Sequence, residues 1–153
     1  LDKKPLIGVL ALQGAVEEHC DAVTRSGGQA REVKYTKDME GCDGMILPGG
    51  ELQVSKGQER LKNQLIRKNI NMFALNTLFL AAMAILGESS GLFEALRTWV
   101  RSGKPIWGTC AGMILQQRFM QNKTGQALVG GLDVQVCYTS PNTNPNPNPN
   151  PNP

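Results

Sequence analysis

The feature that most constrains this chain is a glycine-flanked cysteine between two apolar runs, at residues 105–115. The first run predicts a short buried strand and the second predicts the start of a helix, so Cys110 falls at a sharp turn between them. The pattern Gly108-x-Cys110-x-Gly112 is that of a nucleophile elbow with cysteine in place of serine. Because glycine lacks a Cβ, the flanking glycines permit the strained backbone of such a turn. The alternative is a buried structural cysteine beside a glycine turn.

A cysteine held at this turn would have the chemistry of a nucleophile. The N-terminus of the following helix favours the thiolate, which is the reactive form of the side chain. The backbone N–H of Ala111 would point toward an oxyanion that develops on a bound carbonyl group. In the loop that follows Pro48, Gly49 and Gly50 could supply the second donor of an oxyanion hole. The alternative for that loop is a plain turn after a strand.

Apolar runs that alternate with helical patterns indicate an α/β fold with a parallel sheet. A continuous apolar run at 6–12 is typical of a strand buried on both faces. The elements predicted after it are a helix at 15–26, strands at 30–35 and 44–47, a helix at 92–102, the strand before Cys110, a helix to about 121 and a strand at 132–137. Ligands of such sheets bind at the carboxyl ends of the strands, which here lead into residues 13–14, 48–51 and 108–112.

The composition is that of a small globular domain without a nucleic-acid or metal site. The 153 residues carry a formal net charge of only +3, mixed in sign, which does not indicate nucleic-acid binding. The four cysteines are widely spaced and none forms a CxxC pair, so we expect neither a zinc site nor a disulfide framework. No cofactor is expected. Reduced thiols and the lack of a secretory signal at the start of the sequence favour a cytoplasmic location.

Four blocks of the sequence resemble a known family. They occur in the family's order, at residues 10–19 (LALQGAVEEH), 42–51 (CDGMILPGGE), 104–112 (KPIWGTCAG) and 128–133 (LVGGLD). Through these blocks the chain is similar to the glutaminase subunit of pyridoxal 5′-phosphate synthase, a class I glutamine amidotransferase of the triad type. The Gly-x-Cys-x-Gly pattern alone would fit any class I glutaminase, whereas the four blocks together are specific.

The resemblance implies a flavodoxin-like parallel sheet with helices on both faces, incomplete at the C-terminal side. It implies hydrolysis of L-glutamine to glutamate, with the ammonia passed to a separate synthase subunit that makes pyridoxal 5′-phosphate (vitamin B6). It assigns Cys110 as the nucleophile and glutamine binding to Gly50 and Glu51. It also places Gln13 and His19, at the first helix, toward the synthase partner.

The chain departs from the family in its catalytic base. The family supplies a His-x-Glu pair late in the sequence, because a cysteine nucleophile needs a base and a carboxylate that orients that base. The one histidine of this sequence is His19, on the first predicted helix. We expect a solvated helix residue there rather than a catalytic base. A non-catalytic splice or truncation form that only binds the synthase partner is therefore the alternative to an active glutaminase.

Residues 52–90 lack the Ser-Thr-Thr signature that the family has after its Pro-Gly-Gly-Glu loop. We interpret residues 5–51 and 91–136 as family-like, with a non-family insert between them. An apolar stretch at 70–87 has the length of a membrane span, but its polar residues and its place inside the domain argue against insertion. A surface-packed or poorly ordered helical insert is expected, and sequence read through in error is another interpretation. Ser89, in a Gly-Glu-Ser repeat of the family motif, is the candidate for a glutamine-binding serine.

Asn-Pro repeats make up most of residues 141–153. Proline at every second position removes backbone donors and blocks both helices and inner strands. We therefore predict a domain at residues 1–140 followed by a disordered or extended tail. Such a tail could bind a partner, or it could be a spurious end from a frameshift or a retained intron.

Overall fold

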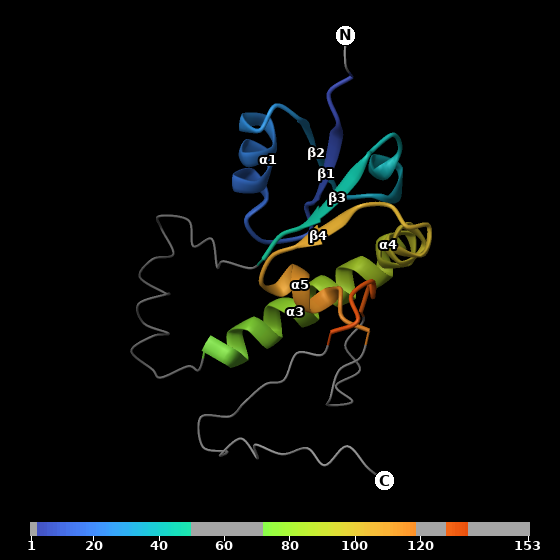
Figure 1. Ribbon diagram of the computed structural model, residues 1–153. Helices are drawn as coiled ribbons and strands as arrows, with labels where there is room; N and C mark the ends of the chain where they lie inside the picture. The colour runs from blue at the N-terminus through green and yellow to red at the C-terminus, as the bar shows by residue number, and fades with distance from the viewer. Residues whose placement is uncertain (1–2, 50–71, 119–127, 135–153) are drawn as a thin grey trace, which may run out of the picture.

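A parallel sheet forms the centre of the structure (Figure 1). The computed structural model describes residues 3–49, 72–118 and 128–134, with the backbone alone described at 72–80. Among these residues the sheet has four strands in the order β2-β1-β3-β4. The elements in chain order are β1 (Leu6–Leu10), α1 (Val16–Arg25), β2 (Gln29–Val33), η1 (Thr36–Met39), β3 (Gly44–Leu47), α3 (Met72–Ser89), α4 (Leu92–Arg101), β4 (Ile106–Gly108) and α5 (Ala111–Leu115).

The apolar strand β1 lies inside the sheet, between β2 and β3. Leu6 is opposite Gln29 on β2, and Ile7 is opposite Gly44 on β3. β4 pairs with the other side of β3, also in parallel. All four strands therefore run in one direction, and the carboxyl ends of β1, β3 and β4 meet at the same edge of the sheet. The predicted α/β fold with a parallel sheet is confirmed.

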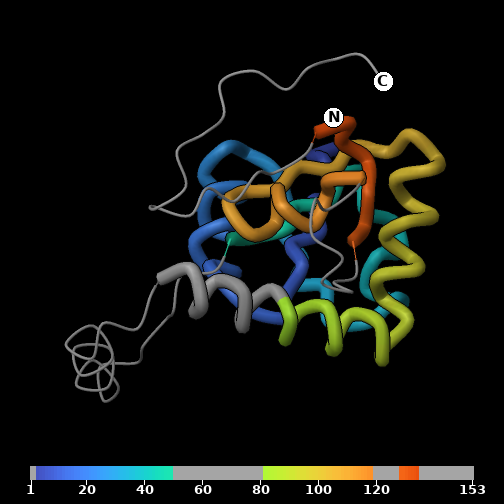
Figure 2. Tube along the Cα trace, turned by 90° about the horizontal axis from the view of Figure 1, so that it is seen from below, coloured from blue at the N-terminus to red at the C-terminus, as the bar shows by residue number. Residues whose placement is uncertain are grey.

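Helices cover the two faces of the sheet unequally. Figure 1 shows α1 on one side of the sheet and α4 on the other, and Figure 2 shows α3 and α4 meeting at an angle, with α5 in the space that they frame. On α4, Leu92, Phe93, Leu96 and Trp99 are buried, whereas α1 has no buried residue. The hydrophobic core, which includes residues from β1, β2 and β3, therefore lies on the side of α3, α4 and α5.

The structure confirms most predicted elements and shortens several of them, such as the first strand, which ends at Leu10 instead of residue 12. β3 spans Gly44–Leu47, as predicted. α5 ends at Leu115 instead of continuing to about residue 121. Gln117, just beyond it, pairs with Leu132 in a single parallel bridge. Within the described part of the chain, this bridge is all that forms of the predicted last strand. The predicted tail lies outside the described residues.

α3 packs on the core with one side and is exposed on another. Met83 and Ala84 are 0% and 7% exposed and belong to the core, whereas the neighbouring Ile85 is 69% exposed. This helix is apolar on all sides, so the side that happens to face α4 and α5 can be buried. No helix among residues 3–49, 72–118 and 128–134 is long and apolar enough to cross a bilayer.

The role of α3 in the core can be tested by truncating two neighbouring side chains. We expect Met83→Ala to lower the free energy of unfolding by about 2–5 kcal/mol, because it leaves a cavity in the core. Ile85→Ala, at an exposed position of the same helix, should change it by less than about 0.5 kcal/mol. Urea denaturation of both variants measures the difference. Equal midpoints would show that α3 does not pack on the domain in solution.

Candidate active site

Cys110 lies at a strained turn between β4 and α5. It is the N-cap residue of α5, with φ 49° and ψ −112°. Among the described residues it is the one non-glycine with positive φ. Such a conformation costs about 1–3 kcal/mol and persists only where the surrounding structure enforces it. The Cys110 side chain is exposed, so the predicted elbow geometry is confirmed.

The flanking glycines are required by the close packing of this turn. A Cβ on Gly112 would overlap the carbonyl oxygen of Leu47, at the end of β3. A Cβ on Gly108 would lie 2.5 Å from the carbonyl oxygen of Gly112. In the loop after β3, a Cβ on Gly49 would lie 2.7 Å from the Cβ of Cys110. The sequence pattern is thus a consequence of the contact between α5 and the end of β3.

Three loops at the carboxyl ends of the strands meet beside Cys110, as the sequence predicts. The backbone N–H of Thr109 donates to Leu47 O at 3.1 Å, which extends the pairing of β4 with β3. The Gly49 N–H donates to Thr109 Oγ1 at 2.9 Å. The Ala15 N–H, from the loop after β1, donates to Gly49 O at 3.2 Å. Both polar groups of Gly49 are therefore bonded to the other two loops.

His19 also belongs to this group of residues. Its Nε2 lies 3.2 Å from Thr109 Oγ1, and its Nδ1 lies 2.6 Å from Ala15 O. The ring centroid is 6.1 Å from that of Trp107 on β4. The prediction of a solvated helix histidine is therefore wrong, because helical spacing cannot reveal a partner on a distant loop. Thr109 was missed by sequence reasoning, although its hydroxyl lies in the motif directly before Cys110.

Comparisons with known proteins agree with this geometry. The model of the SNO glutamine amidotransferase family matches residues 9–77 and 58–140. The chain belongs to this family.

Relatives of the chain carry names within the same family. It is 36% identical over 133 residues to "Pyridoxal 5'-phosphate synthase subunit PdxT" of Streptomyces avermitilis, a match that covers 86% of this chain and 52% of the relative. It is 39% identical over 132 residues to "Probable pyridoxal 5'-phosphate synthase subunit PDX2" of Arabidopsis thaliana, with 85% of this chain and 41% of the relative covered. The chain thus spans about half the length, or less, of these curated relatives.

A solved structure supports the fold assignment. The chain superposes on "Crystal structure of glutamine amidotransferase" with a TM-score of 0.61 and 28% sequence identity, over 84% of this chain and 54% of that one. The order β2-β1-β3-β4 is also the start of the flavodoxin-like strand order. The flavodoxin-like fold and the resemblance to the glutaminase subunit of pyridoxal 5′-phosphate synthase are confirmed. The boundaries predicted for the insert, 52 and 90, stay predictions, since the two matched ranges run across them.

The donors predicted for an oxyanion hole beside Cys110 differ in their availability. No hydrogen bond between described residues uses the Ala111 N–H, which starts α5 next to Cys110. The Gly49 N–H, in contrast, is bonded to Thr109 Oγ1. Gly50 lies outside the described residues. Ala111 is therefore the better-placed donor in this arrangement, and the part of Gly49 and Gly50 stays a prediction.

Only some of the predicted binding residues belong to the described part of the structure. Glu51 lies outside the described residues, as does Gly50. Ser89 ends α3, where its hydroxyl donates to Leu86 O at 3.2 Å within the same helix. Figure 1 shows this end of α3 beside α4, away from the turn between β4 and α5. Gln13 is exposed at the carboxyl end of β1.

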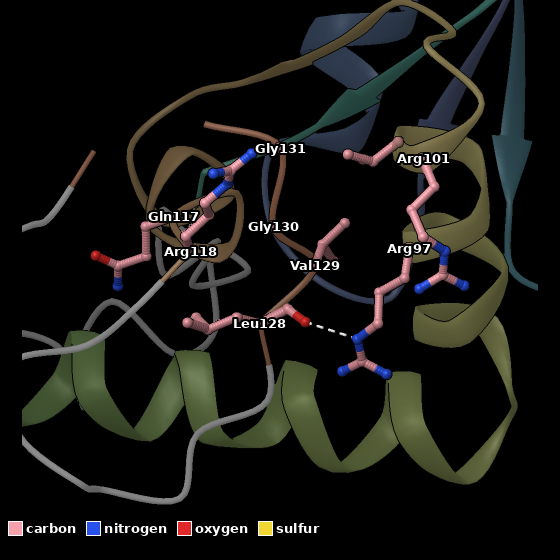
Figure 3. A pocket seen from close by; sticks show the side chains of 9 residues that line it. Arg97, Arg101, Gln117, Arg118, Leu128, Val129, Gly130 and Gly131 are labelled. Carbon is pink, nitrogen blue, oxygen red and sulfur yellow. Dashed lines mark hydrogen bonds between the residues drawn. The ribbon is translucent and has the colours of Figure 1, made fainter. Parts of the chain in front are cut away.

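A pocket of about 470 Å³ lies beside α4 (Figure 3). Its lining includes three arginines, whose charges have partners. Arg97 pairs with Glu88 and Glu94 and donates from Nε to Leu128 O at 2.8 Å. Arg101 pairs with Glu94 at 2.8 Å, and Arg118 is 4.0 Å from Asp133. The Arg97–Glu88 pair joins α4 to the end of α3, the pairs with Glu94 lie within α4, and the Arg118–Asp133 pair lies outside this helix. Cys110 is not part of this pocket.

The contact between α5 and β3 predicts that Gly112→Ala is strongly destabilising. Alanine favours helices, but its Cβ would meet Leu47 O, which belongs to the backbone and cannot rotate away. We expect a loss of about 3 kcal/mol or more in the free energy of unfolding. Gly44→Ala is the matched control, because the shortest contact of its Cβ would be 3.3 Å to the end of the Ile7 side chain, with Pro105 atoms no nearer than 3.7 Å. Guanidinium denaturation measures the free energy of unfolding of the two variants. Equal values would refute the close contact between Gly112 and Leu47 O.

The described cysteines should differ in their rates of alkylation. Burial raises the pKa of the Cys42 thiol. The pKa of the Cys20 thiol is raised by burial and by neighbouring carboxylates, Glu32 first among them. A raised pKa means less thiolate at neutral pH, so iodoacetamide should modify the exposed Cys110 first.

Peptide mass spectrometry over a pH series measures these rates. Labelling of Cys20 and Cys42 should increase as the pH rises through their raised pKa values. Modification of Cys42 as fast as Cys110 at neutral pH would contradict the packing described above.

Proposed function

We propose that this chain is a glutaminase that hydrolyses L-glutamine to glutamate and passes the ammonia to a synthase subunit for pyridoxal 5′-phosphate synthesis. The observation that carries this proposal is the exposed Cys110 at the strained N-cap of α5. It occurs in a family named for glutamine amidotransfer. Relatives are named as subunits of pyridoxal 5′-phosphate synthase, which supports the synthase as partner.

In the proposed reaction, the Cys110 sulfur attacks the γ-carboxamide carbon of glutamine. The thiol proton goes to the leaving nitrogen, so that ammonia departs and a γ-glutamyl thioester remains. The Ala111 N–H stabilises the oxyanion that forms in between. Water then hydrolyses the thioester, which gives glutamate and restores the thiol. Gly50 and Glu51 are the residues that we propose for glutamine binding, whereas the position of Ser89 at the end of α3, away from Cys110, argues against the predicted role of its hydroxyl.

The proposed partner surface is the α1 side of the domain, where Gln13 and His19 lie. Gln13 is exposed and no residue of α1 is buried, so the outer side of this helix is open to a protein partner. Both ring nitrogens of His19 are bonded inside the chain, which leaves the ring edge for a partner contact. Cytoplasmic location is also part of the proposal, in agreement with the free state of Cys20, Cys42 and Cys110.

A second function, binding of the synthase without catalysis, is favoured by one observation. The sequence has a single histidine, and both nitrogens of His19 already have partners, one of them the hydroxyl of Thr109. A cysteine nucleophile without a base keeps binding and electrostatic help but turns over very slowly. The two functions agree on the partner and differ in glutamate release.

The proposal predicts covalent labelling of Cys110 by diazo-oxo-norleucine, an electrophilic analogue of glutamine. Cys110→Ser should abolish this labelling and any release of glutamate, because the thiolate is lost. Cys20→Ser, on α1, is the matched control and should keep both. The assay is repeated with a purified synthase subunit of pyridoxal 5′-phosphate synthase.

The outcomes separate the two functions. Labelling together with glutamate release supports the glutaminase. A stable complex with the synthase subunit but no glutamate supports the non-catalytic binder. Labelling of a different cysteine would refute the assignment of Cys110.

A further inference from the structure

Four residues beside Cys110 form a closed ring of hydrogen bonds. The Ala15 N–H donates to Gly49 O at 3.2 Å, and the Gly49 N–H donates to Thr109 Oγ1 at 2.9 Å. Thr109 Oγ1 lies 3.2 Å from His19 Nε2, and His19 Nδ1 lies 2.6 Å from Ala15 O. Ala15, Gly49 and His19 each contribute two polar groups, and Thr109 contributes its hydroxyl. The ring thus connects the loops after β1, β3 and β4 with the first turn of α1.

The chemistry of these groups fixes the direction of three of the four bonds. The Ala15 and Gly49 N–H groups can only donate, and the carbonyl of Ala15 can only accept, so Nδ1 of His19 carries a proton. The Thr109 hydroxyl donates to Nε2 of a neutral imidazole and accepts from Nε2 of a protonated one. In either state the hydroxyl has two partners, His19 and Gly49.

Thr109 connects the ring of hydrogen bonds to the neighbouring Cys110. Its backbone N–H donates to Leu47 O at 3.1 Å, and its carbonyl accepts from the Gly112 N–H at 2.8 Å. With the side chain also held by His19 and Gly49, Thr109 is fixed at the backbone and at the hydroxyl. The next residue is Cys110, whose φ of 49° requires a rigid surround.

We propose that His19 is a positioning residue for Cys110, acting through the Thr109 hydroxyl. The ring holds the end of β4 against the Gly49 loop and α1, and this keeps the Cys110 sulfur in the orientation that a bound glutamine side chain requires. His19 touches neither substrate nor sulfur in this role. The inference rests on the proposed function only in treating Cys110 as the nucleophile.

A double-mutant cycle tests the link between the two side chains. The variants are His19→Ala, Thr109→Val and the combination, with Thr109→Ser as the conservative variant that keeps the hydroxyl. Thr24→Val is the matched control, because the Thr24 hydroxyl bonds only to Cys20 O along α1. Peptide mass spectrometry measures the rates at which diazo-oxo-norleucine and iodoacetamide label Cys110. Labelling of the buried Cys42 by iodoacetamide reports any unfolding.

We expect each single variant to slow labelling by the glutamine analogue about 10-fold or more, since small misplacements of a nucleophile are costly. Iodoacetamide needs no such alignment, and its rate should change less than about 3-fold. The double variant should lose no more than either single one, because both changes break the same link. Thr109→Ser and Thr24→Val should label at the parent rate.

The outcomes distinguish this inference from the proposed function. If the parent chain labels and both single variants label at the same rate, the positioning role is refuted and the glutaminase proposal stands. Additive losses in the double variant would also refute it, because the two side chains would then act separately. A parent chain that does not label at Cys110 overturns the proposed function together with the inference. If Thr109→Val makes Cys42 react with iodoacetamide, this variant has lost its fold. The positioning role is then judged from the Cys110 labelling rates of His19→Ala and Thr109→Ser.

Discussion

The first turn of α5 lies against the end of β3, so close that Gly112 has no room for a Cβ beside the carbonyl oxygen of Leu47. Much of the site follows from this contact. It forces the chain to leave β4 through a turn too tight for ordinary backbone, and Cys110 takes the positive φ that the turn requires. The same contact brings Gly49 within van der Waals range of Cys110. The exposed Cys110 side chain and the Gly49 loop therefore meet at one edge of the sheet.

The strain at Cys110 has to be offset by the packing and hydrogen bonds around it. The core on the side of α3, α4 and α5 holds the base of the turn, through buried residues such as Leu115. On the other side the hydrogen bonds of Thr109 hold the turn to β3 and to α1. The two faces thus contribute differently, since α1 supplies polar contacts to the site and no buried residue to the core.

Sequence reasoning could find what depends on local pattern. The strand at 44–47, the helix starting at Leu92 and the elbow at Cys110 follow from apolar runs and glycine positions. It could not find the bond between His19 and Thr109, because these residues are 90 positions apart and only the finished sheet brings them together. The buried part of α3 was missed for a similar reason. A helix that is apolar on every side gives no sign of which side will face the core.

The fold is proposed to present Cys110 as a nucleophile beside the Ala111 N–H. A crystal structure of the chain after reaction with diazo-oxo-norleucine tests this arrangement. We expect a covalent bond to Cys110 Sγ, a positive φ at Cys110, and an adduct oxygen within hydrogen-bond distance of the Ala111 nitrogen. An adduct on another cysteine, or a Cys110 relaxed to negative φ with the adduct oxygen turned away from Ala111, would contradict it.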